Sequence, residues 1–107
     1  MMNLQPRYFD YMKNGTKRIE LRLFDEKRRR IKIGDVIEFT SEGDTLRMKV
    51  VGLLRYETFR ELVRDFDITI LADKSMTKEE LLMTLDEFYP AEKQAKFGVV
   101  GIRVELE

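Results

Sequence analysis

Three stretches of the chain repeat apolar residues with the spacing of an α-helix. The first runs from Pro6 to Lys13, where proline suits the first turn and Asn14-Gly15 supplies a left-handed stop. The second follows a capping box that begins at Thr58, and the third follows a similar box at Thr77 and ends at Tyr89-Pro90. We expect three helices, each with one apolar stripe on a core. The stripes are Tyr8, Phe9 and Met12, then Phe59, Leu62, Val63 and Phe66, then Leu81, Leu82, Leu85 and Phe88.

Four other stretches alternate apolar and polar residues, which is typical of β-strands. The expected strands are Arg18–Phe24, Val36–Thr40, Thr45–Tyr56 and Phe97–Leu106. Ser41–Asp44 is expected to be a hairpin turn, and Gly52 a bulge or bend in the long strand. The alternation predicts a closed or nearly closed barrel with one core, to which these residues contribute: Ile19, Leu21, Val36, Met48, Val50, Val100, Ile102 and Val104.

The remaining segments, Asp25–Lys32 and Asp67–Met76, are expected to be loops. The order of elements is then helix, strand, strand, long strand, two helices and a last strand. Such an order predicts an α+β domain with a mixed or closed sheet rather than a doubly wound one. A length of 107 residues fits one domain spanning residues 1–107.

The amino-acid composition limits the cellular compartment and the kinds of catalytic or metal site that the chain can have. Hydrophobic residues make up 43% of the chain, enough to fold as a globular domain, and no apolar run approaches the length of a membrane span. Cysteine and histidine are absent, which removes disulfides, thiol nucleophiles and the commonest zinc ligands. We therefore expect a cytoplasmic protein without membrane association, metal site or cofactor.

Charge is distributed unevenly along a chain whose net charge is zero. Residues 1–60 hold 14 Lys and Arg against 9 Asp and Glu, whereas residues 61–107 hold 6 against 11. Such segregation can produce a basic face for a polyanion, and an ordinary solvated surface is the alternative.

The segment from Asn14 to Arg22 joins the helix stop to a strand with a charged face. Glu20 and Arg22 lie two residues apart, so their Cα atoms are roughly 6.5–7 Å apart and their side chains can form an ion pair. From this spacing alone, an exposed ion pair that contributes little to stability remains an alternative to a functional site.

The motifs of the whole chain resemble the ASCH domain family, and most closely its small stand-alone prokaryotic members. The resemblance rests on G-x-K-x-x-E-x-R from Gly15 to Arg22, Gly34-Asp35 before a strand, Tyr56-x-x-Phe59, Tyr89-Pro90, and the closing Phe97-Gly98-Val99-Val100. It implies a PUA-like mixed β-barrel with flanking helices and a cleft between barrel and helices. Members of the family are proposed to bind RNA. The strand that usually precedes the first helix is very short here.

The resemblance places the ligand at a charged cleft that binds RNA or a nucleotide or nucleoside. It implies cleft positions for Gly15, Lys17, Glu20 and Arg22, with Tyr56, Phe59 and Tyr89 as candidate aromatic neighbours. The chemistry agrees in kind, because lysine and arginine contact phosphate and a carboxylate accepts hydrogen bonds from base amino groups. A second candidate patch for RNA phosphates consists of Lys27, Arg28, Arg29, Arg30 and Lys32. Its alternative is a solvated loop that Asp25 and Glu26 partly neutralise.

An enzyme is the alternative function. Some small ASCH proteins similar to this chain are amidohydrolases that remove the acetyl group from acetylcytidine with a Lys, a Thr and a Glu. The Lys matches Lys17, but Glu20 stands at the position of the Thr, and Lys74, next to Asp73, falls near the position of the acid. Lys17 and Glu20 would carry catalysis if the chain is a hydrolase. A protein-interaction module that uses the Leu81–Phe88 helix is a third reading, and the oligomeric state is left open.

Overall fold

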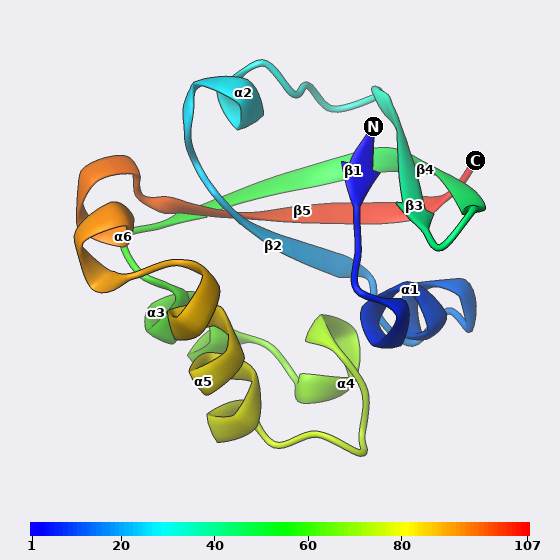
Figure 1. The fold of residues 1–107 in the computed structure, drawn as a ribbon. Helices are drawn as coiled ribbons and strands as arrows, with labels where there is room; N and C mark the ends of the chain where they lie inside the picture. Colours follow the sequence, from blue (N-terminus) through cyan, green and yellow to red (C-terminus); the bar gives the residue numbers. More distant parts are fainter.

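The computed structural model describes residues 1–107 as a five-stranded sheet with six helices around it (Figure 1). The strands are β1 (Met2–Asn3), β2 (Ile19–Leu23), β3 (Val36–Ser41), β4 (Asp44–Tyr56) and β5 (Val99–Leu106). The helices are α1 (Pro6–Lys13), α2 (Glu26–Arg29), α3 (Phe59–Asp65), α4 (Ile68–Leu71), α5 (Lys78–Phe88) and α6 (Ala91–Phe97). None of these helices combines the length and the apolar composition that crossing a bilayer requires.

The sheet is a curled half-barrel whose strands follow the order β1-β3-β4-β5-β2. Neighbouring strands are antiparallel except that β1 runs parallel to β3. The register of β4 on β5 shifts between Val50 and Gly52, which confirms the expected bulge. Two edges remain at β1 and β2, so the barrel is open on one side.

Two apolar clusters, one on each face of the sheet, replace the single core expected from the alternation. One cluster joins the inner residues of β3, β4 and β5 to Phe9 and Met12 of α1. The other joins Ile19 and Leu21 of β2 to α3, α4 and α5. Val36 was wrongly expected in the core. It is 38% exposed, because alternation along β3 puts it on the face opposite to the buried Ile37 and Phe39.

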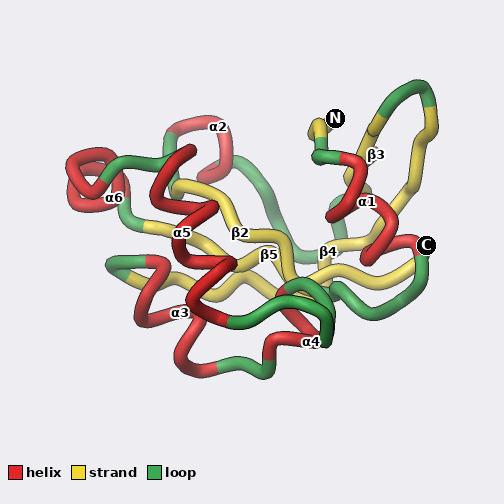
Figure 2. The backbone as a smooth tube through the Cα atoms, turned by 60° about the horizontal axis from the view of Figure 1, so that its bottom comes forward, coloured by secondary structure: helices red, strands yellow, loops and turns green.

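The helices group in the same way. Figure 2 shows α3, α4 and α5 together on one side of the sheet and α1 beside β3, while Tyr8 and Tyr11 of α1 also pack against the cluster of α3, α4 and α5. The capping boxes begin their helices as expected, since the Thr58 hydroxyl accepts from Glu61 N and the Thr77 hydroxyl accepts from Glu80 N. These caps fix where the α3–α5 layer starts.

Three short helices differ from the expectation from sequence. The supposed loops contain α2 and α4, each of four residues, where Asp25 accepts a hydrogen bond from Arg28 N and Asp67 from Thr69 N. Pro90 is the N-cap of α6, a helix that was not expected from the sequence, and Gly98 with φ of +72° ends it. Helices of one or two turns contain too few apolar residues for a clear repeat, so periodicity does not reveal them.

Candidate ligand-binding cleft

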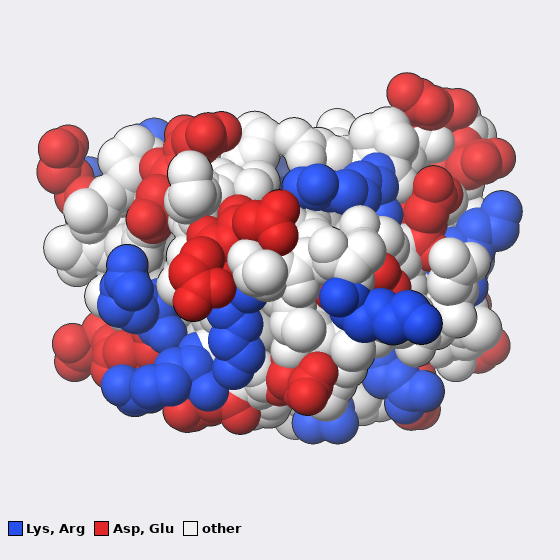
Figure 3. All heavy atoms as spheres, turned by 90° about the horizontal axis from the view of Figure 1, so that it is seen from below, with Lys and Arg blue, Asp and Glu red and all other residues white.

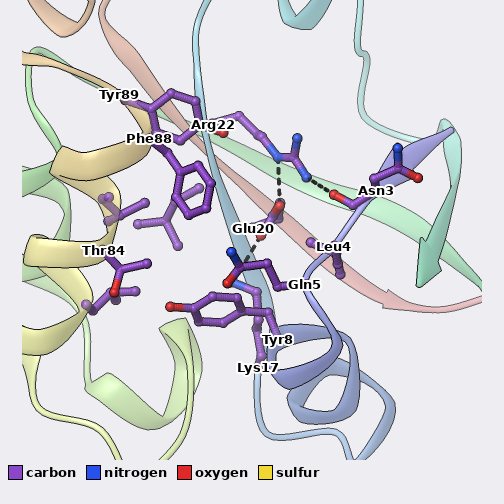
Figure 4. A pocket seen from close by; sticks show the side chains of 13 residues that line it. Asn3, Leu4, Gln5, Tyr8, Lys17, Glu20, Arg22, Thr84, Phe88 and Tyr89 are labelled. Atoms are coloured by element: carbon purple, nitrogen blue, oxygen red, sulfur yellow. Dashed lines mark hydrogen bonds and ion pairs between the residues drawn. The ribbon is translucent and has the colours of Figure 1, made fainter. Parts of the chain in front are cut away.

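A cleft of about 210 Å³ lies where the half-barrel is open, between the two edge strands and α5. Asn3, Gln5 and Tyr8 line it from β1 and α1, and Thr84, Phe88 and Tyr89 face them from α5 and its end (Figure 4). Lys17, Glu20 and Arg22 form the floor at β2. The cleft thus combines a charged floor with walls that carry aromatic rings.

Lys17 is buried at one end of the floor, with an exposed fraction of 2%. Its ammonium group donates to three acceptors: Ile19 O at 2.5 Å, Leu71 O at 2.8 Å and Glu20 Oε1 at 3.2 Å. Leu71 ends α4, and the carbonyl end of a helix favours a cation. Burial holds the pKa of Lys17 below its ordinary value, against the opposing influence of the Glu20 carboxylate.

Glu20 joins two cations on the floor of the cleft. Oε1 lies 3.2 Å from Lys17 Nζ and Oε2 lies 2.7 Å from Arg22 Nε. Burial would raise the pKa of this carboxyl group, but Lys17 and Arg22 outweigh that effect and hold its pKa below the ordinary value. Glu20 is therefore ionised, and the pair of side chains is not the exposed ion pair that spacing alone allowed.

Arg22 connects the floor to the opposite edge of the barrel. Besides the bond to Glu20, its Nη2 donates to the backbone carbonyl of Asn3 at 2.7 Å, which bridges β2 and β1. Burial disfavours the charged guanidinium, yet the Glu20 carboxylate prevails and raises the pKa of Arg22 above its ordinary value. Nη1 makes no hydrogen bond within the protein, so the group retains a free donor for a ligand.

The local sequence explains how these three charges meet. After α1, Gly15 takes a φ of +84°, and the amides of Thr16 and Lys17 both donate to Tyr11 O, which turns the chain into β2. Alternation along β2 then puts Glu20 and Arg22 on one face, opposite Ile102 and Val100 of β5.

Three aromatic rings border the floor. The Tyr8 ring lies on the α1 side, with Lys17 Nζ 5.8 Å from its centroid. Tyr89 packs on Phe59 and on Phe88, with centroid distances of 5.4 and 6.4 Å. Phe88 was expected on the apolar stripe of its helix, but it is 55% exposed at the mouth of the cleft. An exposed ring beside a charged floor is the kind of surface on which a flat ligand can stack.

Not every residue expected at the cleft lines it. Gly15 shapes the turn before β2 but is not in the lining, and Phe59 is fully buried beneath Tyr89. Tyr56 points elsewhere, since its hydroxyl donates to Asp65 Oδ2 at 2.9 Å, a bond that raises the pKa of the phenol. Lys17, Glu20, Arg22 and Tyr89 do come together.

Other lining residues could not be selected from sequence. Tyr8 and Phe88 look like members of apolar helix stripes, and Thr84 is one hydroxyl among many. Asn3 and Gln5 enter the cleft because β1 pairs with β3, a long-range contact that a two-residue strand does not reveal. No group of acidic side chains is arranged to hold a metal ion.

The sequence model of the ASCH domain family matches residues 2–107. The chain belongs to the ASCH domain family. Two solved structures resemble this ASCH domain along nearly its whole length. The crystal structure of hypothetical protein PH0355 has a TM-score of 0.89 and 40% identity, with 99% of this chain and 96% of that chain covered. The solution NMR structure of protein PF0455 from Pyrococcus furiosus has a TM-score of 0.79 and 39% identity, with coverage of 98% and 94%.

These likenesses confirm the α+β, PUA-like fold expected from the sequence motifs. The names of these two proteins state no activity, and a comparison with curated proteins found no match. The family as a whole supports a general association of this ASCH domain with RNA binding. The ligand has to be argued from the cleft itself.

The basic segment of the ASCH domain is partly neutralised. Arg28 pairs with Asp25 at 3.1 Å and Arg30 pairs with Glu26 at 3.2 Å, whereas Arg29 forms no ion pair. Lys27 and Lys32 are exposed, and no carboxylate lies within ion-pair distance of either. The patch expected from the sequence therefore divides into paired and free cations.

Charge segregation along the chain does not give one sign to the face formed by α3, α4 and α5. Figure 3 shows Lys and Arg interspersed with Asp and Glu there, in small groups next to one another. This face is accordingly an ordinary solvated surface.

Proposed function

We propose that this ASCH domain binds RNA or a nucleotide-like ligand in the cleft, with a base among the aromatic rings and a phosphate or base edge at Arg22. The observation that carries the proposal is the fixed guanidinium of Arg22, which lines the cleft, is held by Glu20 and Asn3 O, and has one nitrogen, Nη1, without a partner in the protein. Proteins that bind unpaired bases combine aromatic rings, on which the bases stack, with cationic donors that contact the backbone. Both components are present at the cleft.

Each residue of the floor has a separate role in this proposal. Arg22 contacts the ligand, because a guanidinium can hold a phosphate or the acceptors of a base. Glu20 and Lys17 position it, since both oxygens of Glu20 and all three protons of Lys17 are already engaged in the protein. Glu20 contributes to ligand choice through its remaining lone pairs.

The walls set the size of what can enter. A volume of about 210 Å³ is below the range of about 300–1,000 Å³ that is usual for drug-sized ligands. Tyr8 lines the cleft on one side and Phe88 with Tyr89 on the other (Figure 4). A cleft of this volume suits one flat ring system better than a base pair. The cleft therefore favours an unpaired base.

An amidohydrolase acting on acetylcytidine-like nucleosides is the alternative. In its favour, a buried lysine and the hydroxyl of Thr84 line the same cleft. A base must be neutral, however, and Lys17 contacts a carboxylate, while the Thr84 hydroxyl donates to Glu80 O at 3.0 Å. Thr16 and Thr77 are not in the lining. Binding is the better supported function, and a cytoplasmic location stays a prediction from the sequence.

The test compares Arg22→Gln and Tyr89→Ala with Arg103→Gln, which removes an exposed charge of β5. Affinities for nucleoside monophosphates and short single-stranded RNA are measured by titration, after thermal unfolding has shown that each variant is folded. Loss of stacking at Tyr89 should cost about 1–3 kcal/mol of binding free energy, and Arg22→Gln should weaken every ligand. Equal affinities of all three variants and the wild type would contradict the proposal. Cytidine formed from acetylcytidine by the wild type but not by Lys17→Ala would favour the hydrolase.

A further inference from the structure

A second cationic site, outside the cleft, surrounds the ring of Phe24. The guanidinium of Arg29 lies 4.8 Å from the ring centroid, and that of Arg55 lies 4.2 Å from it. Arg29 comes from α2 and Arg55 from β4, so the ring gathers two cations from distant parts of the chain. We call Phe24, Arg29 and Arg55 the Phe24 cluster.

Neither arginine of the Phe24 cluster has a carboxylate partner. Arg29 donates from Nε to Phe24 O at 3.2 Å, which fixes its side chain and leaves both terminal nitrogens free. Arg55 takes part in no ion pair, in contrast to Arg28 and Arg30 of the same region. The ring stabilises each cation, but the two like charges repel one another, and a bound anion would relieve that repulsion.

The sheet places the Phe24 cluster on the face that Arg22 shares. Arg55 lies opposite Val100 in the pairing of β4 with β5, and Val100 lies opposite Arg22 in the pairing with β2. Residues opposite each other in antiparallel strands point to the same face. Two strand spacings of about 4.8 Å separate the backbones of Arg22 and Arg55 by about 10 Å. A ligand with a base in the cleft and an anionic group at Arg55 therefore extends along this face of the sheet.

We propose that the Phe24 cluster binds the phosphate backbone of a single-stranded RNA whose base occupies the cleft. This inference rests on the proposed function of the cleft and narrows it, because a free nucleoside or nucleoside monophosphate would leave the Phe24 cluster empty. Arg29 and Arg55 supply planar forks that match phosphate oxygens, and an unpaired strand can turn one base into the cleft while its backbone continues.

The experiment compares Arg29→Gln/Arg55→Gln with Lys13→Gln/Lys49→Gln, a control that removes two exposed charges from α1 and β4. Each protein is titrated with a fluorescent single-stranded RNA of about six nucleotides, at several salt concentrations, and with nucleoside monophosphates and triphosphates. The Arg29/Arg55 variant should bind RNA at least fivefold more weakly than the control and monophosphates equally well. The slope of the logarithm of its RNA affinity against the logarithm of salt concentration should become shallower by about 1.4, since each phosphate contact on a single strand contributes about 0.7.

The outcomes separate the Phe24 cluster from the cleft. If the Arg29/Arg55 variant has the same RNA affinity and salt slope as the control, the role proposed for the Phe24 cluster is wrong. The proposal for the cleft would still stand. If the Arg29/Arg55 variant loses as much affinity for nucleoside triphosphates as for RNA, the Phe24 cluster binds a free nucleotide. That result would overturn the proposal that it binds the RNA backbone. If RNA binding depends on Arg29 and Arg55 but Arg22→Gln has no effect, the Phe24 cluster is a binding site. The proposal that the cleft binds a base would then be wrong. A charge-preserving Arg55→Lys variant should keep most of the RNA affinity, and a loss as large as that of the double variant would contradict the phosphate role.

Discussion

At the scale of single residues, Glu20 decides the character of the cleft. Its carboxylate holds Lys17 on one oxygen and Arg22 on the other, at 3.2 and 2.7 Å, in a place from which water is nearly excluded. A buried charge without a partner costs several kcal/mol. The three side chains are consequently interdependent, and the orientation of Arg22 depends on both of the others.

Replacing Glu20 by Gln should lower the free energy of unfolding at neutral pH by about 3–5 kcal/mol, because Lys17 and Arg22 would remain buried without a counter-charge. The folded-state pKa of Glu20 lies below the value of 4.5 of a free side chain. The stabilisation by the carboxylate is thus fully present above pH about 4.5 and is lost as the pH falls through the folded-state pKa. Urea unfolding of wild type and variant between pH 7 and pH 3 should show a difference that narrows toward acid.

The control for this measurement is Glu105→Gln, which changes an exposed carboxylate of β5. It should leave the free energy of unfolding within about 0.5 kcal/mol of the wild type. If Glu20→Gln is no more destabilising than Glu105→Gln, the ion pairs on the floor of the cleft contribute nothing to stability.

At the scale of elements, α5 serves both the core and the cleft. Leu81 and Leu85 belong to the buried apolar cluster and also line the cleft, together with Thr84 and Phe88. The four residues stand at i, i+3, i+4 and i+7, so they share one face of the helix. Leu81 and Leu85 are buried, whereas Phe88, at the end of the helix, is 55% exposed at the mouth of the cleft. The charged face of β2 is positioned in the same way by its alternation.

Two phenylalanines at the ends of α3 and α5 provide a matched test of this division. Phe59→Ala should lower the free energy of unfolding by about 3–5 kcal/mol, because Phe59 is fully buried and would leave a cavity. Phe88→Ala should cost about 1 kcal/mol or less, because the ring is 55% exposed, but it should weaken ligand binding. Chemical denaturation and ligand titration check the pair, and a Phe88 variant as unstable as Phe59→Ala would return that ring to the core.

Particular elements show how far the sequence could predict the fold. The bounds of α1 and the bulge at Gly52 were predicted from proline, glycine and periodicity, which are local signals. The helix α4 was not, although its Leu71 carbonyl is what completes the environment of Lys17. Sequence indicated that Lys17, Glu20 and Arg22 belong together, but their burial depends on long-range packing that no local pattern contains.

At the scale of the whole molecule, the two edge strands β1 and β2, which are not paired with each other, explain both why the half-barrel is open and where the cleft lies. The sheet ends at β1 and β2, and a side-chain bond from Arg22 to Asn3 O spans the two edges. Helix α5 faces the gap, so the cleft is bordered by parts of the chain that are far apart in sequence. Arg22 consequently belongs to both the architecture and the proposed binding site.

A titration of ¹⁵N-labelled protein with short single-stranded RNA, followed by NMR, tests the central claim most directly. The account predicts that the largest amide shifts occur around Tyr8, Arg22 and Tyr89, and that nucleoside monophosphates shift the same amides at higher concentration. Arg22→Gln should greatly reduce these shifts, whereas amides remote from the cleft should keep the positions that they have in the free wild-type protein. Shifts confined to the outer face of the sheet around Lys49 and Arg103, or no shifts at saturating RNA, would contradict the account.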